Sequence, residues 1–174
     1  SEAVLSAEER ELGVAMVDLG GGTTDLAIFL DGSIRHTAVL PIGGQNLTKD
    51  LAIGLLTSQT DAEKIKVQHG IARTELVHGH QMVEVPSVGD RPPRQFTRRD
   101  IAEILEPRVE EMFDLVKREI VRAGYEGMLG AGVVITGGTS LLEGMPDAAE
   151  RGLNLPARRG MPTGIGGLRD IVSN

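Results

Sequence analysis

The chain has 174 residues, of which 40% are hydrophobic, and its formal net charge is −7. This length and apolar content suit one domain, or two small lobes, with a substantial hydrophobic core. Aromatic residues make up only 2% of the sequence and cysteine is absent from it. Nucleic-acid recognition, which needs a basic surface and aromatic rings that stack on bases, is therefore disfavoured, and disulfides and thiol catalysis are excluded.

Residues 1–11 are interpreted as a solvated approach segment, and the most informative stretch follows at 14–29. There an apolar run, interpreted as a strand buried on both faces, leads from Asp18 into three consecutive glycines and two threonines. Glycines leave backbone N–H groups free to point at an anion. Because a carboxylate beside them would repel a bare phosphate, we expect a cation in between. The stretch predicts a Mg-nucleotide phosphate clamp, and a glycine-rich hairpin without a ligand is the alternative.

The elements after this turn distinguish it from commoner phosphate loops. The sequence contains no Gly-Lys-Ser/Thr, the signature of a Walker loop. Its glycines lead into a strand at 26–30, whereas the glycines of Walker and dinucleotide loops lead into a helix. Asp31-Gly32 predicts a hairpin turn into a third strand at 34–40. An amphipathic helix is predicted at 45–56, and a shorter one at 61–70 with Asp61 as its N-cap.

Two pairs of polar residues in the middle of the chain have simple default interpretations. Glu63 and Lys66 are three residues apart on one helix face, so they predict a surface ion pair unless a nucleotide lies nearby. His78 and His80 have no further ligand at metal-binding spacing, and they predict an exposed turn before a strand at 81–85.

The longest helix is predicted at 97–123. Thr97 and Asp100 have the spacing of a helix cap, and an apolar stripe runs along the segment that follows. Pro107 removes a backbone donor, so we expect it to kink or divide this helix.

A second glycine turn follows a buried strand at 132–136. Gly137 and Gly138 would let a flat ring or a phosphate lie against the backbone, and the helix expected after them would favour negative charge. Ser140 and Glu143 have capping-box spacing. A purely structural turn explains this stretch as well as a ligand site does. Residues 156–168 are interpreted as an ordered loop that returns over the sheet.

The order of these patterns is similar to that in the second half of an actin-superfamily ATPase. The patterns are DLGGGTTD, PIGG, DAEKIK and ITGGTSLLEGM. Longer stretches resemble the FtsA family of bacterial cell-division proteins: RHTAVLPIGGQNLTKDLAIGL, DAEKIKVQHG, EPRVEEMFDLVKREI and ARRGMPTGIGGLRDIVSN.

This resemblance implies an α/β fold: an actin-like (ribonuclease H-like) ATPase lobe with a mixed sheet and flanking helices, plus a small inserted α+β lobe. Residues 1–58 and 129–174 would form the lobe called 2A, and residues 59–128 the inserted lobe 2B. The family's first phosphate loop would precede Ser1, and its membrane helix would follow Asn174. We therefore expect this chain alone to bind ATP weakly or not at all.

The resemblance also implies an ATP site with Mg. Asp18 would hold the water shell of Mg. The phosphate contacts would be Gly20, Gly21, Gly22, Thr23 and Thr24. Glu63 and Lys66 would face the ribose and adenine, and the adenosine would be bordered by Gly137, Gly138, Thr139 and Ser140.

Lobe 2B would dock the acidic tail peptide of the tubulin-like partner FtsZ. An acidic peptide needs guanidinium groups, which predicts a docking cluster at Arg91, Arg94, Arg98, Arg99 and Arg108. A solvated basic helix start is the alternative.

The implied function is a scaffold at the division site. It would link FtsZ filaments to the inner face of the cytoplasmic membrane through segments outside this chain, self-associate into actin-like filaments and contact other division proteins, with at most weak ATP hydrolysis. A pilus-assembly relative that binds a short peptide, and an ATP-hydrolysing or sugar-kinase member of the superfamily, are the alternatives.

Overall fold

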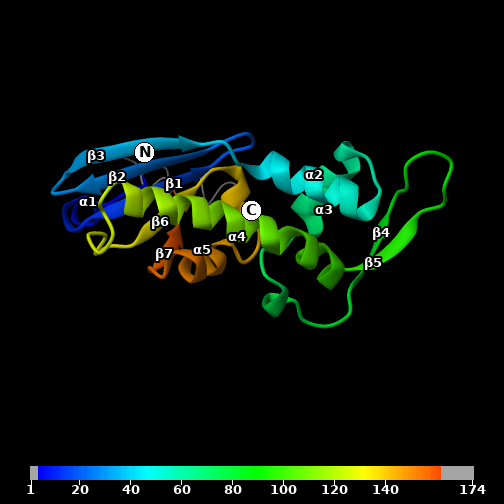
Figure 1. The fold of residues 1–174 in the computed structure, drawn as a ribbon. Coiled ribbons are helices and arrows are strands. Elements are labelled where there is room, and N and C mark those ends of the chain that lie inside the picture. Colours follow the sequence, from blue (N-terminus) through cyan, green and yellow to red (C-terminus); the bar gives the residue numbers. More distant parts are fainter. Residues whose placement is uncertain (1–3, 162–174) are drawn as a thin grey trace, which may run out of the picture.

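The computed structural model describes residues 4–161, and its centre is a mixed five-stranded sheet (Figure 1). The strand order is β3-β2-β1-β6-β7. The strands are β1 (Val14–Leu19), β2 (Thr24–Leu30), β3 (Ser33–Leu40), β6 (Val133–Thr136) and β7 (Ala157–Arg159). The first three form an antiparallel meander, whereas β1, β6 and β7 are mutually parallel. The predicted buried strands and the meander are confirmed.

The hairpin between β2 and β3 depends on its two turn residues. Asp31 and Gly32 have φ angles of 54° and 83°. Two successive positive φ values are typical of the turn whose twist matches that of the flanking strands. The hairpin predicted from Asp31-Gly32 is therefore confirmed.

The helices and a small hairpin lie around and beside this sheet. They are α1 (Ala7–Leu12), α2 (Gly44–Leu55), α3 (Gln59–His69), α4 (Arg98–Arg122), α5 (Met145–Leu153), the 3₁₀ turns η1 (Thr74–Leu76) and η2 (Gly138–Leu141), and strands β4 (Met82–Val85) and β5 (Arg94–Thr97). Figure 1 shows α4 running from the large sheet to the β4–β5 hairpin; α2 packs against its N-terminal half, and α3 packs on α2. None of the helices within 4–161 is long and apolar enough to cross a bilayer.

Helix α4 is the longest element, and it begins at the predicted cap. The Thr97 hydroxyl accepts the Asp100 N–H at 3.0 Å, while the Asp100 carboxylate accepts the Thr97 N–H at 2.9 Å. Pro107 does not divide the helix, which continues to Arg122. Its apolar stripe, from Ile101 to Ile120, is buried on both sides of the proline, so tertiary packing compensates for the missing donor.

Several predicted boundaries are wrong, and each has a local cause. Of the segment interpreted as solvated, residues 4–11 are described: α1, which starts at the capping box of Ser6 and Glu9, buries none of its side chains, whereas Val4 and Leu5 pack on a small core with Phe29. Helix α3 begins before Asp61, because Ser58 is its N-cap and accepts the Asp61 N–H.

The predicted loop at 156–168 contains an edge strand. Residues 157–159 form β7, which pairs with β6. A polar three-residue strand at a sheet edge has little hydrophobic pattern, so the sequence did not indicate it. The remainder from 162 on, with the last part of the predicted lobe 2A, lies outside the described residues.

Candidate functional site

The turn between β1 and β2 presents free backbone donors. Gly20 closes the turn, since its N–H donates to the Thr23 carbonyl at 3.0 Å. Within residues 4–161, the N–H groups of Gly21, Gly22 and Thr23 have no hydrogen-bond acceptor, and all three residues are exposed. Successive N–H groups of this kind form a concave site for an anion.

The start of α2 holds this turn in place. The carbonyl oxygens of Gly20 and Gly21 accept the N–H groups of Gly44 and Gln45, each at 2.8 Å. Two orphan donors of the helix N-terminus are thus satisfied by the turn. The turn therefore directs its carbonyl groups toward α2 and leaves the three free N–H groups for a ligand.

Asp18 and Gly137 meet at the ends of two parallel strands. Asp18 is paired with Thr136 in the sheet, and its carboxylate has no hydrogen-bond partner within the described chain. A Cβ on Gly137 would overlap the Asp18 carboxylate and lie 2.5 Å from the Leu19 carbonyl oxygen. Gly137, at φ 88°, therefore allows a close approach of β6 to a carboxylate that is free to hold a hydrated cation.

The two threonines of the turn have different surroundings. Thr23 is exposed, and its hydroxyl donates to the Asp25 carboxylate at 3.3 Å. Thr24 is fully buried, and its hydroxyl donates to the Ile42 carbonyl at 2.8 Å. Thr24 thus ties the turn to the segment before α2, and its hydroxyl is already engaged there.

Glu63 and Lys66 belong to a network that joins α3 to α2. The Lys66 ammonium is 2.9 Å from the Glu63 carboxylate and donates to the Gly44 carbonyl at 3.1 Å and the Thr48 hydroxyl at 3.0 Å. The Lys66 side chain is only 12% exposed, so the default interpretation as a surface pair is wrong for it. Burial raises the pKa of Glu63, but its bonds to Thr48 and Lys66 outweigh this and leave the pKa below its ordinary value.

The second glycine turn approaches the first through Thr139. The Thr139 hydroxyl donates to the Gly20 carbonyl at 3.3 Å, and a Cβ on Gly44 would overlap that hydroxyl. Ser140 is buried, and its hydroxyl donates to the Gly137 carbonyl at 2.6 Å. The predicted Ser140–Glu143 capping box is wrong, because the next helix, α5, starts only at Met145.

One cleft of about 1000 Å³ connects these segments. Its lining includes Gly21, Gln45, Glu63, Lys66, Gly138 and Thr139. Gly21 of the predicted phosphate turn, the α3 pair and the second glycine turn therefore border a single space. Asp18 approaches Gly137, the neighbour of Gly138 in the chain, whereas Thr24 and Ser140 are buried. Gln45 and Thr48 had no recognisable signal in the sequence, because their roles depend on how α2 packs.

The five arginines predicted as one docking cluster are distributed over different sites. The Arg98 guanidinium bonds the carbonyls of His69 and Gly70 and the Glu143 carboxylate. Arg108 makes a bidentate bond to Asp50 at 2.8 and 3.0 Å and a third to Glu111.

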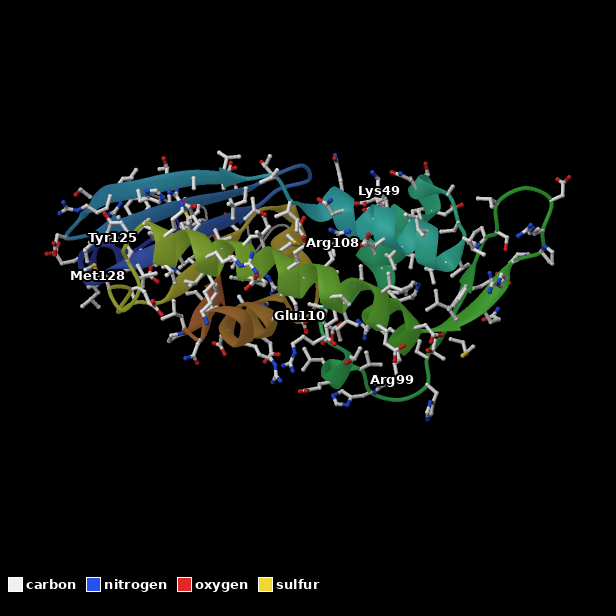
Figure 2. All side chains as sticks on the ribbon, viewed as in Figure 1. Lys49, Arg99, Arg108, Glu110, Tyr125 and Met128 are labelled. Carbon is white, nitrogen blue, oxygen red and sulfur yellow. The ribbon has the colours of Figure 1, made fainter. Side chains whose placement is uncertain are left out.

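The remaining three arginines lie near the β4–β5 hairpin. The guanidinium of Arg94 lies 5.1 Å from the centre of the Phe96 ring. Arg91 and Arg99 are in no salt bridge among the described residues. Figure 2 shows Arg99 and Arg108 on different sides of α4. The nine residues from Arg99 to Arg108 turn the helix by about 900°, which is two and a half turns, so the two side chains leave on opposite faces.

Comparison with solved structures shows the actin-like fold. MreB5 of Spiroplasma citri bound to ADP superimposes with a TM-score of 0.74 at 19% identity, over 99% of this chain and 58% of that one. The ethanolamine utilization protein EutJ from Carboxydothermus hydrogenoformans gives a TM-score of 0.63 at 27% identity, over 87% of this chain and 46% of that one. The PilM–PilN type IV pilus biogenesis complex gives a TM-score of 0.65 at 18% identity, over 90% of this chain and 38% of that one.

Sequence comparison gives the family. Residues 15–174 match the family model for cell division protein FtsA. FtsA of Pseudomonas aeruginosa is 49% identical over 99% of this chain and 41% of that protein. FtsA of Escherichia coli K12 is 45% identical over 99% of this chain and 43% of that protein, so the chain spans about two-fifths of these curated relatives. The family model and the individual relatives agree, and the chain belongs to the FtsA family of cell division proteins.

Proposed function

We propose that this chain contributes half of a Mg-ATP site to an actin-like scaffold of cell division. The observation that carries the nucleotide assignment is a group of three N–H donors, at Gly21, Gly22 and Thr23, which have no acceptor within residues 4–161, with the Asp18 carboxylate, unpaired in that same range, nearby. A phosphate group needs the donors, and its Mg ion needs an oxygen ligand for its water shell. The end of β1 and the turn that follows it supply both.

The other walls of the cleft suit the sugar and the base. Glu63, whose pKa is below its ordinary value, offers a carboxylate that accepts hydrogen bonds from ribose hydroxyls. Gly138 has nothing within 4 Å of the position where a Cβ would stand, which leaves room for a flat ring against its backbone. Lys66 is held by three acceptors and shapes the wall between these two groups.

A first experiment tests the nucleotide assignment in the full-length protein. Replacing Asp18→Asn removes the charge that would attract hydrated Mg, so we expect weaker binding of Mg-ATP in isothermal titration and little change for ATP with EDTA. Asp90→Asn, on the exposed tip of the β4–β5 hairpin, is the matched control. Equal Mg-ATP affinity of wild type and Asp18→Asn would refute the role of Asp18.

We further propose that residues 59–128 form the lobe that docks the acidic tail of FtsZ. Membership of the FtsA family supports this, together with the cationic surface at Arg91, Arg94 and Arg99 near the β4–β5 hairpin. Arg98 and Arg108 belonged to the predicted cluster, but their guanidinium groups are engaged within the chain. The association with FtsZ filaments, the membrane and the septal ring is part of the same proposal, as is self-association.

The docking experiment uses a synthetic FtsZ tail peptide and the full-length protein. Reversing the charge at Arg94 and Arg99 leaves the internal bonds of Arg98 and Arg108 intact, and we expect at least about a tenfold loss of peptide affinity. Arg118→Glu, in the C-terminal half of α4, is the control. Unchanged peptide binding would refute this surface. Binding of a pilus-assembly peptide in place of the FtsZ tail would favour the alternative relative.

A further inference from the structure

Arg98 is the first residue of α4, and it ties together three segments at the edge of the nucleotide cleft. Its Nε donates to the His69 carbonyl at 3.1 Å, and its Nη2 lies 3.4 Å from the Gly70 carbonyl. The same guanidinium forms an ion pair with Glu143, which lies between η2 and α5. The planar fork of arginine suits such simultaneous contacts with carbonyl and carboxylate oxygens.

The backbone supports the same junction. The Ala72 N–H donates to the Glu143 carbonyl at 2.8 Å, and Ile71 and Glu143 form an isolated parallel bridge. Gly70 has no room for a side chain, because a Cβ there would overlap the Lys66 carbonyl and lie 2.6 Å from Leu142 Cδ1. The end of α3 is therefore packed directly against the segment that follows the second glycine turn.

Both partners of the ion pair line the cleft. Arg98 and Glu143 border the same space as Glu63, Lys66 and Thr139. Helix α3 carries the pair proposed for ribose and adenine, and η2 carries the turn proposed for adenosine. These two walls are far apart in sequence, and the Arg98–Glu143 pair is a side-chain connection between the regions that follow them.

We infer that the Arg98–Glu143 ion pair is a latch that holds these two walls together and slows release of the nucleotide. This inference rests on the proposed nucleotide function. Arg98 acts through α3 and Glu143, so it is a positioning residue. Because separation of the walls precedes release, the latch acts mainly on the dissociation rate. Glu143 is 61% exposed, so the pair is partly screened and its loss has a modest effect.

The experiment measures release of a fluorescent ATP analogue from the full-length protein by stopped-flow displacement with unlabelled ATP. Glu143→Lys places a second cation beside Arg98, and we expect dissociation up to about fivefold faster, the factor for about 1 kcal/mol. Glu143→Gln keeps an acceptor but removes the charge, and about a twofold increase is expected. Since ionic strength screens the pair, the difference between wild type and Glu143→Gln should shrink at high salt.

The control has the same change of charge at a distant place. Glu126→Lys alters an exposed turn between Tyr125 and Met128, which Figure 2 shows beyond the C-terminal end of α4. We expect Glu126→Lys to release the nucleotide at the wild-type rate. Thermal unfolding of each variant verifies that it is folded before its kinetics are compared.

Each outcome has a separate meaning. A folded Glu143→Lys variant with the wild-type dissociation rate would overturn the latch and leave the nucleotide proposal intact. If Glu143→Lys does not fold, a wild-type rate for Glu143→Gln at low and high salt overturns the latch equally. A wild-type protein that binds no ATP would overturn both the latch and the proposed function.

Discussion

Replacing Gly137 with alanine should destabilise the chain far more than the same change at the adjacent glycine. Gly137 has φ 88° and ψ 165°, a region that is essentially restricted to glycine, so an alanine there costs about 1–3 kcal/mol of backbone strain. The Cβ of that alanine would also overlap the Asp18 carboxylate and lie 2.5 Å from the Leu19 carbonyl oxygen. Such overpacking lowers the free energy of unfolding by a further 1–3 kcal/mol or so. We expect a total of about 2–6 kcal/mol.

Gly138→Ala is the matched control, because a Cβ there meets nothing within 4 Å and its φ is not in the left-handed region. Where the backbone conformation of a glycine is also accessible to alanine, replacing it with alanine stabilises the folded protein by about 0.4–1 kcal/mol. The assay is urea unfolding followed by far-ultraviolet circular dichroism. With a slope of about 2 kcal/mol per M, the midpoint of Gly137→Ala should fall by about 1–3 M relative to wild type. A Gly137→Ala variant as stable as Gly138→Ala would refute the close approach of β6 to Asp18.

Three further predictions concern helix packing and acid stability. Phe113→Ala removes a fully buried ring from α4 and should cost about 3–5 kcal/mol in urea unfolding. In Gly54→Ala the new Cβ would lie 2.7 Å from the Ile104 Cδ1, the flexible end of that side chain, so the packing cost is offset by the roughly 1 kcal/mol that alanine gains over glycine inside a helix and we expect little net change in stability. In a double-mutant cycle with Ile104→Val, which shortens that side chain, the same substitution should be stabilising. Hydrogen bonds with Arg122, and secondly with His36, lower the pKa of Glu119 to about 2. The ionised Glu119 therefore stabilises the folded protein fully above its ordinary pKa near 4.5, and this contribution disappears as the pH falls through about 2. Glu119→Gln should therefore lose the pH-dependent part of stability between about pH 4.5 and 2, about 1 kcal/mol after solvent screening, and an acid titration identical to wild type would contradict this.

Local patterns in the sequence were sufficient where neighbours along the chain make the decisive contacts. The Asp31-Gly32 turn and the Thr97–Asp100 cap form as predicted, because each involves residues within about one turn of one another. The apolar stripe of α4 was predicted for the same reason, since a helix repeats its buried face every 3.6 residues or so. The Ser140–Glu143 spacing was misleading, because the buried Ser140 hydroxyl bonds the Gly137 carbonyl instead.

The candidate site shows the limit of such patterns. Each of its three stretches was recognised in the sequence, but the partners of Lys66 on α2 were not, because they depend on how two helices cross. The arginine cluster is the converse case. Closeness in sequence suggested one surface, whereas Arg98 and Arg108 bind carbonyls and carboxylates from distant segments.

The sequence by itself determined four of the five strands of the large sheet, the main helices, the two glycine turns and the family to which the chain belongs. The spacing of apolar residues and the positions of glycines determine the conformation of the residues next to them, so they predict these elements without knowledge of the tertiary structure. Only the tertiary structure decided that Gly21, Glu63 and Thr139 border one cleft, and that Arg98 spans from α3 to Glu143. Those contacts join residues far apart in the chain, and packing of the helices and the sheet selects them.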